Sequence, residues 1–264
     1  MDLKYLTDEV CALARETGDF IRNERRNFKR QYAVKKHAHD YVSYVDKESE
    51  KRIVASLRKL LPEAGFIAEE GSATFNNQDY CWLVDPLDGT TNFIHNVAPF
   101  CVSIALRHHD ECVLGVVYEI CRDECFSTYK GAPSLLNGIP IEVSDVANLD
   151  EAFIALGFPY DSDDYKSTAI HLVRECYGNV TGIRTVGAAA AELCYVAAGR
   201  FDGRIEGYIG PWDIAAGTLI LQNAGGIVTD FNGGQGFTSG LEVLGTNGKI
   251  HTQMLEILSK KHPI

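Results

Sequence analysis

Hydrophobic and polar positions follow a helical period in the first quarter of the chain. Apolar residues three and four positions apart over residues 3–28 predict a long amphipathic helix. A second apolar stripe predicts a helix over residues 45–61, and Pro62 and Gly65 are typical of residues that end a helix. The chain is therefore expected to begin with two successive helices.

Short apolar runs bounded by polar residues follow, and such runs predict β-strands. In the first half of the chain they occupy residues 66–68, 80–84, 101–107, 112–118, 125–129 and 141–143. The last of these runs comes directly after Asn137-Gly138, which is a turn signal. Beyond residue 147, strands predicted near 152–156, 182–185, 201–205, 226–230 and 242–246 alternate with helices predicted at 165–177, 188–198, 213–223 and 249–260.

This change of pattern divides the chain into two halves. Residues 1–146 are expected to form an α+β half with a largely antiparallel sheet. Residues 147–264 are expected to form an α/β half in which strands and helices alternate. We expect the halves to pack closely, because no internal repeat or low-complexity linker separates them.

The composition is that of a globular protein and narrows the possible functions. Hydrophobic residues make up 45% of the 264 residues and charged residues 23%, which are ordinary values for a folded protein. Acidic residues number 36 against 25 basic ones, and the net charge of −11 argues against binding of nucleic acid by charge alone. The apolar stretch from Ile214 to Leu221 is far shorter than the ~20 residues that span a bilayer, so we expect no membrane segment.

The eight cysteines point to buried free thiols. They form no CxxC pair and no zinc-finger spacing. Several of them, such as Cys81, lie within apolar runs. Free thiols are typical of a reducing compartment, and no apolar leader is visible at the N-terminus, so we expect a cytoplasmic location.

Acidic residues gather where predicted strands end. Glu69 and Glu70 follow one short strand, residues 85–93 read Asp-Pro-Leu-Asp-Gly-Thr-Thr-Asn-Phe after another, and residues 212–217 read Trp-Asp-Ile-Ala-Ala-Gly at the start of a helix. Any one of these residues alone is more typical of a solvated loop or a helix cap. Together they suggest a site of oxygen ligands suited to Mg²⁺. Within it, Pro86 would stiffen the loop and Gly89 would let the backbone approach a ligand closely.

These motifs make the chain resemble the inositol monophosphatase family of Mg²⁺-dependent, lithium-sensitive phosphatases. The resemblance covers nearly the whole chain and includes residues 40–46, 137–144 and 187–202. It implies an α+β fold, a layered αβαβα sandwich with the active site between the halves. It also implies a homodimer.

The resemblance implies two to three Mg²⁺ ions as cofactors. Glu69, Asp85 and the main-chain carbonyl of Leu87 would hold one ion, and Asp85, Asp88 and Asp213 a second. Glu69 would also help to place a third, weaker ion. Two ions around a phosphate ester would activate water and neutralise the leaving oxygen, and they would let an anionic substrate approach a cluster of carboxylates.

Catalytic roles are implied in the same way. Asp46 and Thr90 would orient and deprotonate the attacking water, with Glu69 as a further catalytic residue. The amides of Gly89 and Thr90 would receive phosphate oxygens. Lys35 matches a lysine near the active site of the family, with Lys36 beside it as the other possible match.

Substrate choice rests on a few further positions. Glu206 matches the residue that hydrogen-bonds substrate hydroxyls, and Ala189 would lie along the substrate ring. Ala188 stands where Ser or Thr is usual and Arg204 where an aromatic residue is common. For Arg204 we expect a surface ion pair; the alternative is a contact with a second acidic group of the substrate.

The preferred function is hydrolysis of inositol 1-phosphate or a related polyol or sugar monophosphate, a small-molecule phosphate ester. The alternatives are 3′-phosphoadenosine 5′-phosphate, fructose 1,6-bisphosphate or histidinol phosphate as substrate. A binding or regulatory role remains as a different class of function, which a basic surface patch would favour. A nucleic acid is not expected as a partner.

Overall fold

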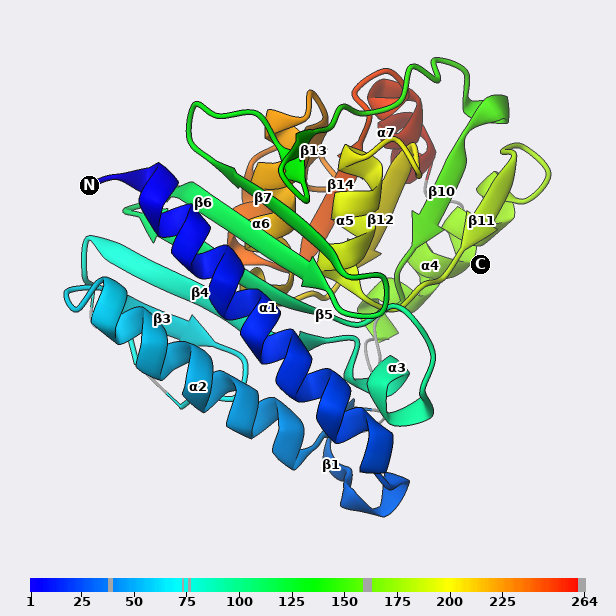
Figure 1. The fold of residues 1–264 in the computed structure, drawn as a ribbon. Helices are drawn as coiled ribbons and strands as arrows, with labels where there is room; N and C mark the ends of the chain where they lie inside the picture. Colours follow the sequence, from blue (N-terminus) through cyan, green and yellow to red (C-terminus); the bar gives the residue numbers. More distant parts are fainter. Residues whose placement is uncertain (38–39, 73, 76, 159–162, 261–264) are drawn as a thin grey trace.

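Helices and sheets alternate in five layers (Figure 1). The computed structural model describes residues 1–264 except 38–39, 73, 76, 159–162 and 261–264. Two sheets, of seven and five strands, are stacked with one pair of helices between them and one pair on each outer side. The predicted αβαβα sandwich is confirmed.

The first helix pair covers the outer face of the seven-stranded sheet. It consists of α1 (Leu3–Asn27) and α2 (Tyr44–Leu60), whose apolar faces share one core with that sheet. The strands, in spatial order, are β3 (Gly65–Ala68), β4 (Tyr80–Asp88), β5 (Cys101–His108), β6 (Glu111–Glu119), β7 (Glu124–Tyr129), β8 (Leu135–Leu136) and β9 (Ile139–Pro140). Only β3 and β4 pair in parallel, so this sheet is largely antiparallel, as predicted.

The central helix pair, α5 (Ala189–Ala197) and α6 (Pro211–Asn223), is buried between the two sheets. A helix covered on both sides carries apolar or small residues all round rather than one stripe, and both sequences have this character. Small residues also set the distance between α6 and the seven-stranded sheet. A Cβ atom on Gly115 of β6 would lie 2.8 Å from the backbone oxygen of Ala216 in α6.

The five-stranded sheet and the last helix pair complete the stack. The strands, in spatial order, are β11 (Gly182–Arg184), β10 (Phe153–Leu156), β12 (Gly203–Gly207), β14 (Glu242–Thr246) and β13 (Ile227–Thr229). The outer helices are α4 (Asp163–Cys176) and α7 (His251–Ser259), and both contribute to the third core. Every strand and helix predicted beyond residue 147 is found within a few residues of its expected place.

The remaining elements are short. They are the 3₁₀ turns η1 (Arg30–Tyr32), η2 (Leu149–Glu151) and η3 (Gly236–Ser239), the helix α3 (Thr90–His95), and the paired strands β1 (Val34–His37) and β2 (Asp40–Val42). Strands β1 and β2 were not predicted, since neither carries an apolar run.

One strand prediction is wrong. Residues 141–143 are not a strand; the turn at Asn137 and Gly138 instead joins β8 to β9. Both turn residues have positive φ, 49° and 81°, as a tight hairpin turn requires. The turn signal was therefore correct, but the strand that follows it is only two residues long.

No helix among the described residues is long and apolar enough to cross a membrane. The division into halves at residues 146 and 147 stays a prediction.

Candidate active site

The main acidic motif lies at the end of β4, within the strand rather than after it. Asp85 pairs with Ser103 of β5 and Asp88 with Cys101, so the register between the strands shifts by one residue. Residues three apart on a regular strand point to opposite faces, but the extra residue of a bulge turns Asp88 back. Both carboxylates are therefore directed toward the central helices.

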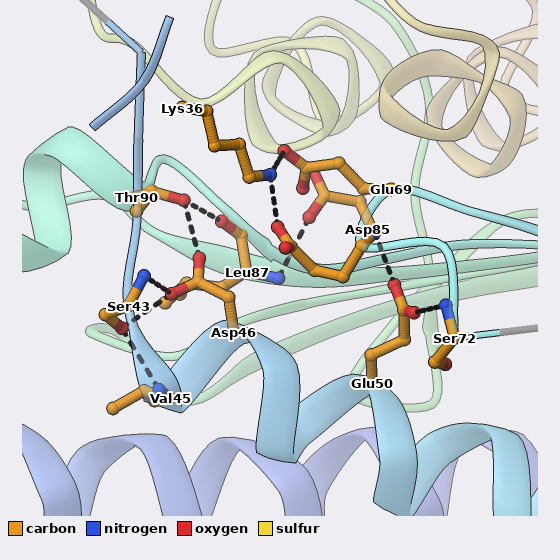
Figure 2. A network of polar contacts seen from close by, with 11 residues as sticks. Lys36, Ser43, Val45, Asp46, Glu50, Glu69, Ser72, Asp85, Leu87 and Thr90 are labelled. Carbon is orange, nitrogen blue, oxygen red and sulfur yellow. Dashed lines mark hydrogen bonds and ion pairs between the residues drawn. The ribbon is translucent and has the colours of Figure 1, made fainter. Parts of the chain in front are cut away.

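Asp85 lies at the centre of the acidic cluster. Its side chain is 2% exposed and its Oδ1 accepts a hydrogen bond from the amide of Leu87 at 2.9 Å (Figure 2). Burial raises its pKa well above the ordinary value, and the charges of Glu69 and Asp213 raise it further. One amide is weak compensation for a buried carboxylate among like charges.

Asp88 and Asp213 are each held by the start of a central helix. Asp88 accepts hydrogen bonds from the amides of Ala189 (3.0 Å) and Ala190 (2.7 Å), the first residues of α5. Burial raises its pKa to about 6 although these bonds oppose the shift. Asp213 lies in the first turn of α6 and accepts from the amide of Gly210 at 2.8 Å. Helix N-termini favour negative charge, which helps both carboxylates to stay in place.

Glu69 follows β3 and contacts a cation. Lys36 of β1 donates to Glu69 Oε1 at 3.1 Å (Figure 2). It also donates to Glu70. Burial lowers the pKa of Lys36, but the two carboxylates outweigh burial and raise it. Burial raises the pKa of Glu70 to about 7, and the charge of Glu69 adds to the rise. The lysine thus neutralises part of the cluster at its open edge.

Glu50 of α2 fixes the turn that carries Glu69. It is fully buried and accepts hydrogen bonds from the amides of Glu70 and Ser72, each at 2.7 Å (Figure 2). The sequence analysis missed this residue. Glu50 lies four residues after Asp46 in the same helix. Residues four apart share one helix face, so this spacing could have indicated that Glu50 also faces the site.

Asp46 and Thr90 form the predicted pair. Asp46 is 1% exposed; its Oδ2 accepts from Ser43 in a capping box at the start of α2. Its Oδ1 is 2.8 Å from Thr90 Oγ1, which also lies 3.0 Å from the carbonyl oxygen of Leu87 (Figure 2). A threonine hydroxyl has one proton to donate, and the carboxylate is the stronger acceptor. Thr90 therefore keeps lone pairs with which it can accept a proton.

Gly89 connects β4 to α3 in a conformation that suits glycine. Its φ is +87°, and a Cβ atom there would lie 3.1 Å from the carbonyl oxygen of Pro99 and 3.3 Å from the Ala188 methyl group. Ala189, 8% exposed, follows directly on the neighbouring helix. The structure thus brings the predicted phosphate and ring positions together beside Asp88.

Glu206 of β12 is paired with Arg204, which is completely buried. Arg204 also donates from Nε to Glu192 Oε2 at 3.1 Å. The expectation of a surface ion pair at Arg204 is therefore wrong, and no direct contact with a substrate group is available to a side chain with 0% exposure. Burial raises the pKa of Glu206 to about 7, and Arg204 opposes the rise.

The predicted lysine position needs a correction in detail. Lys35 is exposed on β1, and Lys36 is the residue that reaches the acidic cluster. Successive residues of a strand point to opposite faces, so only one of the two can face Glu69. Glu50 and Glu192 are further buried polar residues near the site, and the sequence analysis assigned no role to either.

The donor chemistry of this cluster fits Mg²⁺. Glu69, Asp85, Asp88 and Asp213 shift one another's pKa values by charge or are hydrogen-bonded, which places them close together. They offer carboxylate oxygens, the ligands that Mg²⁺ takes together with water. Among the described residues, no three acidic, histidine or cysteine side chains are already arranged around one point. Several of the carboxylate oxygens of this cluster are instead hydrogen-bonded to backbone amides, to Lys36 or to a neighbouring carboxyl group.

Comparison with known proteins agrees with this geometry. The chain matches the profile of the inositol monophosphatase family over residues 2–262. It is 38% identical over 243 residues to the protein named Nus factor SuhB of Escherichia coli strain K12, covering 92% of this chain and 91% of that one. It is 38% identical over 222 residues to the inositol-1-monophosphatase of Mesorhizobium japonicum, covering 84% of each chain.

A solved structure is also closely similar. The extragenic suppressor protein suhB from Bartonella henselae superposes with a TM-score of 0.92 at 34% identity, over 98% of this chain and 100% of that one. The resemblance read from the motifs is thereby confirmed.

Stability of the metal-free protein should fall as the pH rises. The pKa values of Asp88 (about 6) and Glu70 (about 7) are raised in the folded state, so between about pH 4.5 and 7 the folded chain binds more protons than the unfolded chain. In a chelator we expect a lower melting temperature at about pH 7.5 than at about pH 5.5. Added Mg²⁺ should raise the melting temperature most at the higher pH. A melting temperature that rises with pH in chelator would contradict this account.

Proposed function

Because the chain belongs to the inositol monophosphatase family, we propose that it is a Mg²⁺-dependent phosphomonoesterase. Its substrate would be inositol 1-phosphate or a related polyol or sugar monophosphate. The observation that carries the proposal is the Asp46–Thr90 hydrogen bond beside a cluster of four carboxylates, of which Asp85 and Asp88 are buried. A proton acceptor next to oxygen ligands for a cation is what metal-assisted hydrolysis needs.

The acidic cluster would hold two to three ions. Glu69, Asp85 and the Leu87 carbonyl would bind one, Asp85, Asp88 and Asp213 a second, and Glu69 would contribute to a third. Bound Mg²⁺ would supply Lewis-acid activation of water and charge stabilisation at the phosphate. The raised pKa values of Asp85 and Asp213 support this role, because a bound cation would offset both the burial and the repulsion between carboxylates that raise them.

Asp46 and Thr90 would position the attacking water and remove its proton. Thr90 Oγ1 donates to Asp46 Oδ1, which leaves its lone pairs to accept a hydrogen bond from water. A proton taken by Thr90 passes along this hydrogen bond to Asp46. Burial raises the pKa of Asp46, which improves it as a proton acceptor.

The substrate would be held at its two ends. The amides of Gly89 and Thr90 would receive phosphate oxygens, and Lys36 would add positive charge beside Glu69. Ala189 would lie along the ring, and the Glu206 carboxylate would accept hydrogen bonds from ring hydroxyls. We also propose sensitivity to lithium, a homodimeric assembly and a cytoplasmic location, as in the family resemblance described above.

A second, additional role is favoured by a basic groove. Arg22, Arg25 and Arg26 of α1 line a cavity of about 600 Å³ together with Asn96 and Val97. Arg22 is ion-paired with Asp19 and, like Arg25, is anchored by hydrogen bonds to residues of the groove, whereas Arg26 is exposed. This concentration of positive charge on a chain of net charge −11 suits an anionic partner such as a nucleic-acid backbone. The relatives named as Nus factors agree with a binding role.

Asp85→Asn should abolish phosphate release while leaving the fold intact. The amide keeps the shape and the hydrogen bond from Leu87 but removes the charge shared by both proposed metal positions. We expect kcat/KM to fall by about 10³ or more, measured as Mg²⁺-dependent phosphate release. The exposed Asp150→Asn is the matched control and should keep full activity. Undiminished turnover by Asp85→Asn would overturn the mechanism.

Inositol 1-phosphate should be the best substrate in a panel. The other members are glycerol 2-phosphate, fructose 1,6-bisphosphate, 3′-phosphoadenosine 5′-phosphate and histidinol phosphate. Glu206 can accept hydrogen bonds from several ring hydroxyls. Glu206 and Glu192 together outnumber the single positive charge of Arg204, and the remaining negative charge disfavours a second phosphate. The measurement is kcat/KM with and without Mg²⁺. A preference for either bisphosphate would contradict this choice.

Charge reversal at the groove should weaken binding of single-stranded RNA. We expect Arg26→Glu to reduce the affinity about tenfold at low salt and to flatten its salt dependence, measured by fluorescence anisotropy. Lys166→Glu, an exposed cation on α4, is the control. If both variants bind RNA like the wild type, the groove is not a nucleic-acid site.

A further inference from the structure

Arg204 is a completely buried guanidinium group held between two carboxylates. Its exposed fraction is 0%; Nε donates to Glu192 Oε2 at 3.1 Å and Nη2 donates to Glu206. A buried charge is costly unless it is paired and hydrogen-bonded. The two carboxylates are therefore the reason that this arginine can lie inside the protein.

The strand geometry makes room for this arrangement. Arg204 and Glu206 are two residues apart on β12, so their side chains lie on one face. The strand neighbours of Arg204 are Ala155 and Gly245, both small. Glu206 packs against another small residue, since a Cβ atom on Gly157 would lie 2.3 Å from the Glu206 carboxylate.

Glu192 extends the network toward the acidic cluster. Its Oε1 accepts hydrogen bonds from the amides of Val186 (3.1 Å) and Gly187 (3.0 Å), in the segment before α5. The first amides of α5 hold Asp88. Arg204 thus connects Glu206 to the helix that orients a proposed metal ligand.

Stability alone does not account for the arginine. Arg204 Nη1 is buried without a hydrogen-bond partner among the described residues, and an unmet buried donor is destabilising. Apolar replacements of buried ion pairs are often neutral or stabilising. The fork of the guanidinium fixes two carboxylates at once, which a point charge cannot do. The residue that this arrangement holds in place is Glu206, whose side chain remains 18% exposed.

We propose that Arg204 is a positioning residue: it fixes the Glu206 carboxylate as the acceptor for substrate hydroxyl groups and so gives the site its selectivity for polyol phosphates. This role rests on the proposed phosphatase function. Arg204 is fully covered and touches no substrate, so it acts through Glu206. A freely rotating glutamate would lose side-chain entropy on binding the ring. The ion pair already fixes the Glu206 side chain before the substrate binds, so this entropy is not lost on binding.

Two esters with the same ring isolate this effect. Inositol 1-phosphate carries ring hydroxyls, whereas cyclohexyl phosphate has none. We expect Arg204→Gln to lower the ratio of their kcat/KM values about tenfold, through a higher KM for inositol 1-phosphate with little change in kcat. Arg200→Gln is the matched control, because Arg200 also donates two hydrogen bonds to one carboxylate, Glu124 (2.6 and 2.8 Å). It should leave the ratio unchanged.

Two further variants separate positioning from a general structural role. Arg204→Lys keeps the charge but not the fork, and should show an intermediate ratio. Adding Arg204→Gln to Glu206→Gln should lower the ratio no further than Glu206→Gln alone, because the arginine acts through that carboxylate. Equal losses with both esters, or additive losses in the double variant, would overturn the proposal. If Arg204→Gln does not fold, Arg204→Lys decides between these outcomes.

Wild-type turnover of the two esters and of the other members of the substrate panel tests the phosphatase function by itself. A wild type that hydrolyses both esters, with an unchanged ratio in Arg204→Gln, would overturn only the role of Arg204. A wild type inactive with Mg²⁺ toward both esters and toward every other member of the substrate panel would overturn the phosphatase function and this role together.

Discussion

The burial of neighbouring carboxylates is the constraint around which this structure is organised. Asp85, Asp88 and Asp213 lie where β4 meets the starts of α5 and α6, and each is held by one or two backbone amides. Backbone amides within helices and strands have fixed positions, whereas side-chain donors can rotate. The amides therefore hold the carboxylates in one orientation. The cost of this arrangement is visible in the raised pKa values of all three acids.

The layers around the cluster make that cost tolerable. The central helices are packed on both sides by apolar surface, which contributes hydrophobic stabilisation far from the charges. The absence of a side chain at Gly115 lets α6 approach the sheet closely at Ala216. The same packing keeps Asp213 facing Asp85. The packing of the interior thus offsets the free-energy cost of placing these carboxylates close together.

Buried polar side chains around the acidic cluster hold the remaining site residues in position. Glu50 holds the turn that carries Glu69, Ser43 holds Asp46, and Glu192 with Arg204 holds Glu206. All of them are buried, and none needs to contact a substrate. Ligands fixed by such supporting contacts keep their geometry when a cation or an ester binds.

The sequence by itself determined the order of the main helices and strands and the principal acidic residues of the site. Its apolar periods placed the long helices and most strands, because burial of one face is a local property of the pattern. The motif at residues 85–93 indicated the carboxylates, because chemistry of this kind needs particular residue types at fixed spacing. Only the tertiary structure decided between Lys35 and Lys36, showed the support by Glu50, and placed Arg204 inside the protein. Those features depend on contacts between elements far apart in the chain, which no local period encodes.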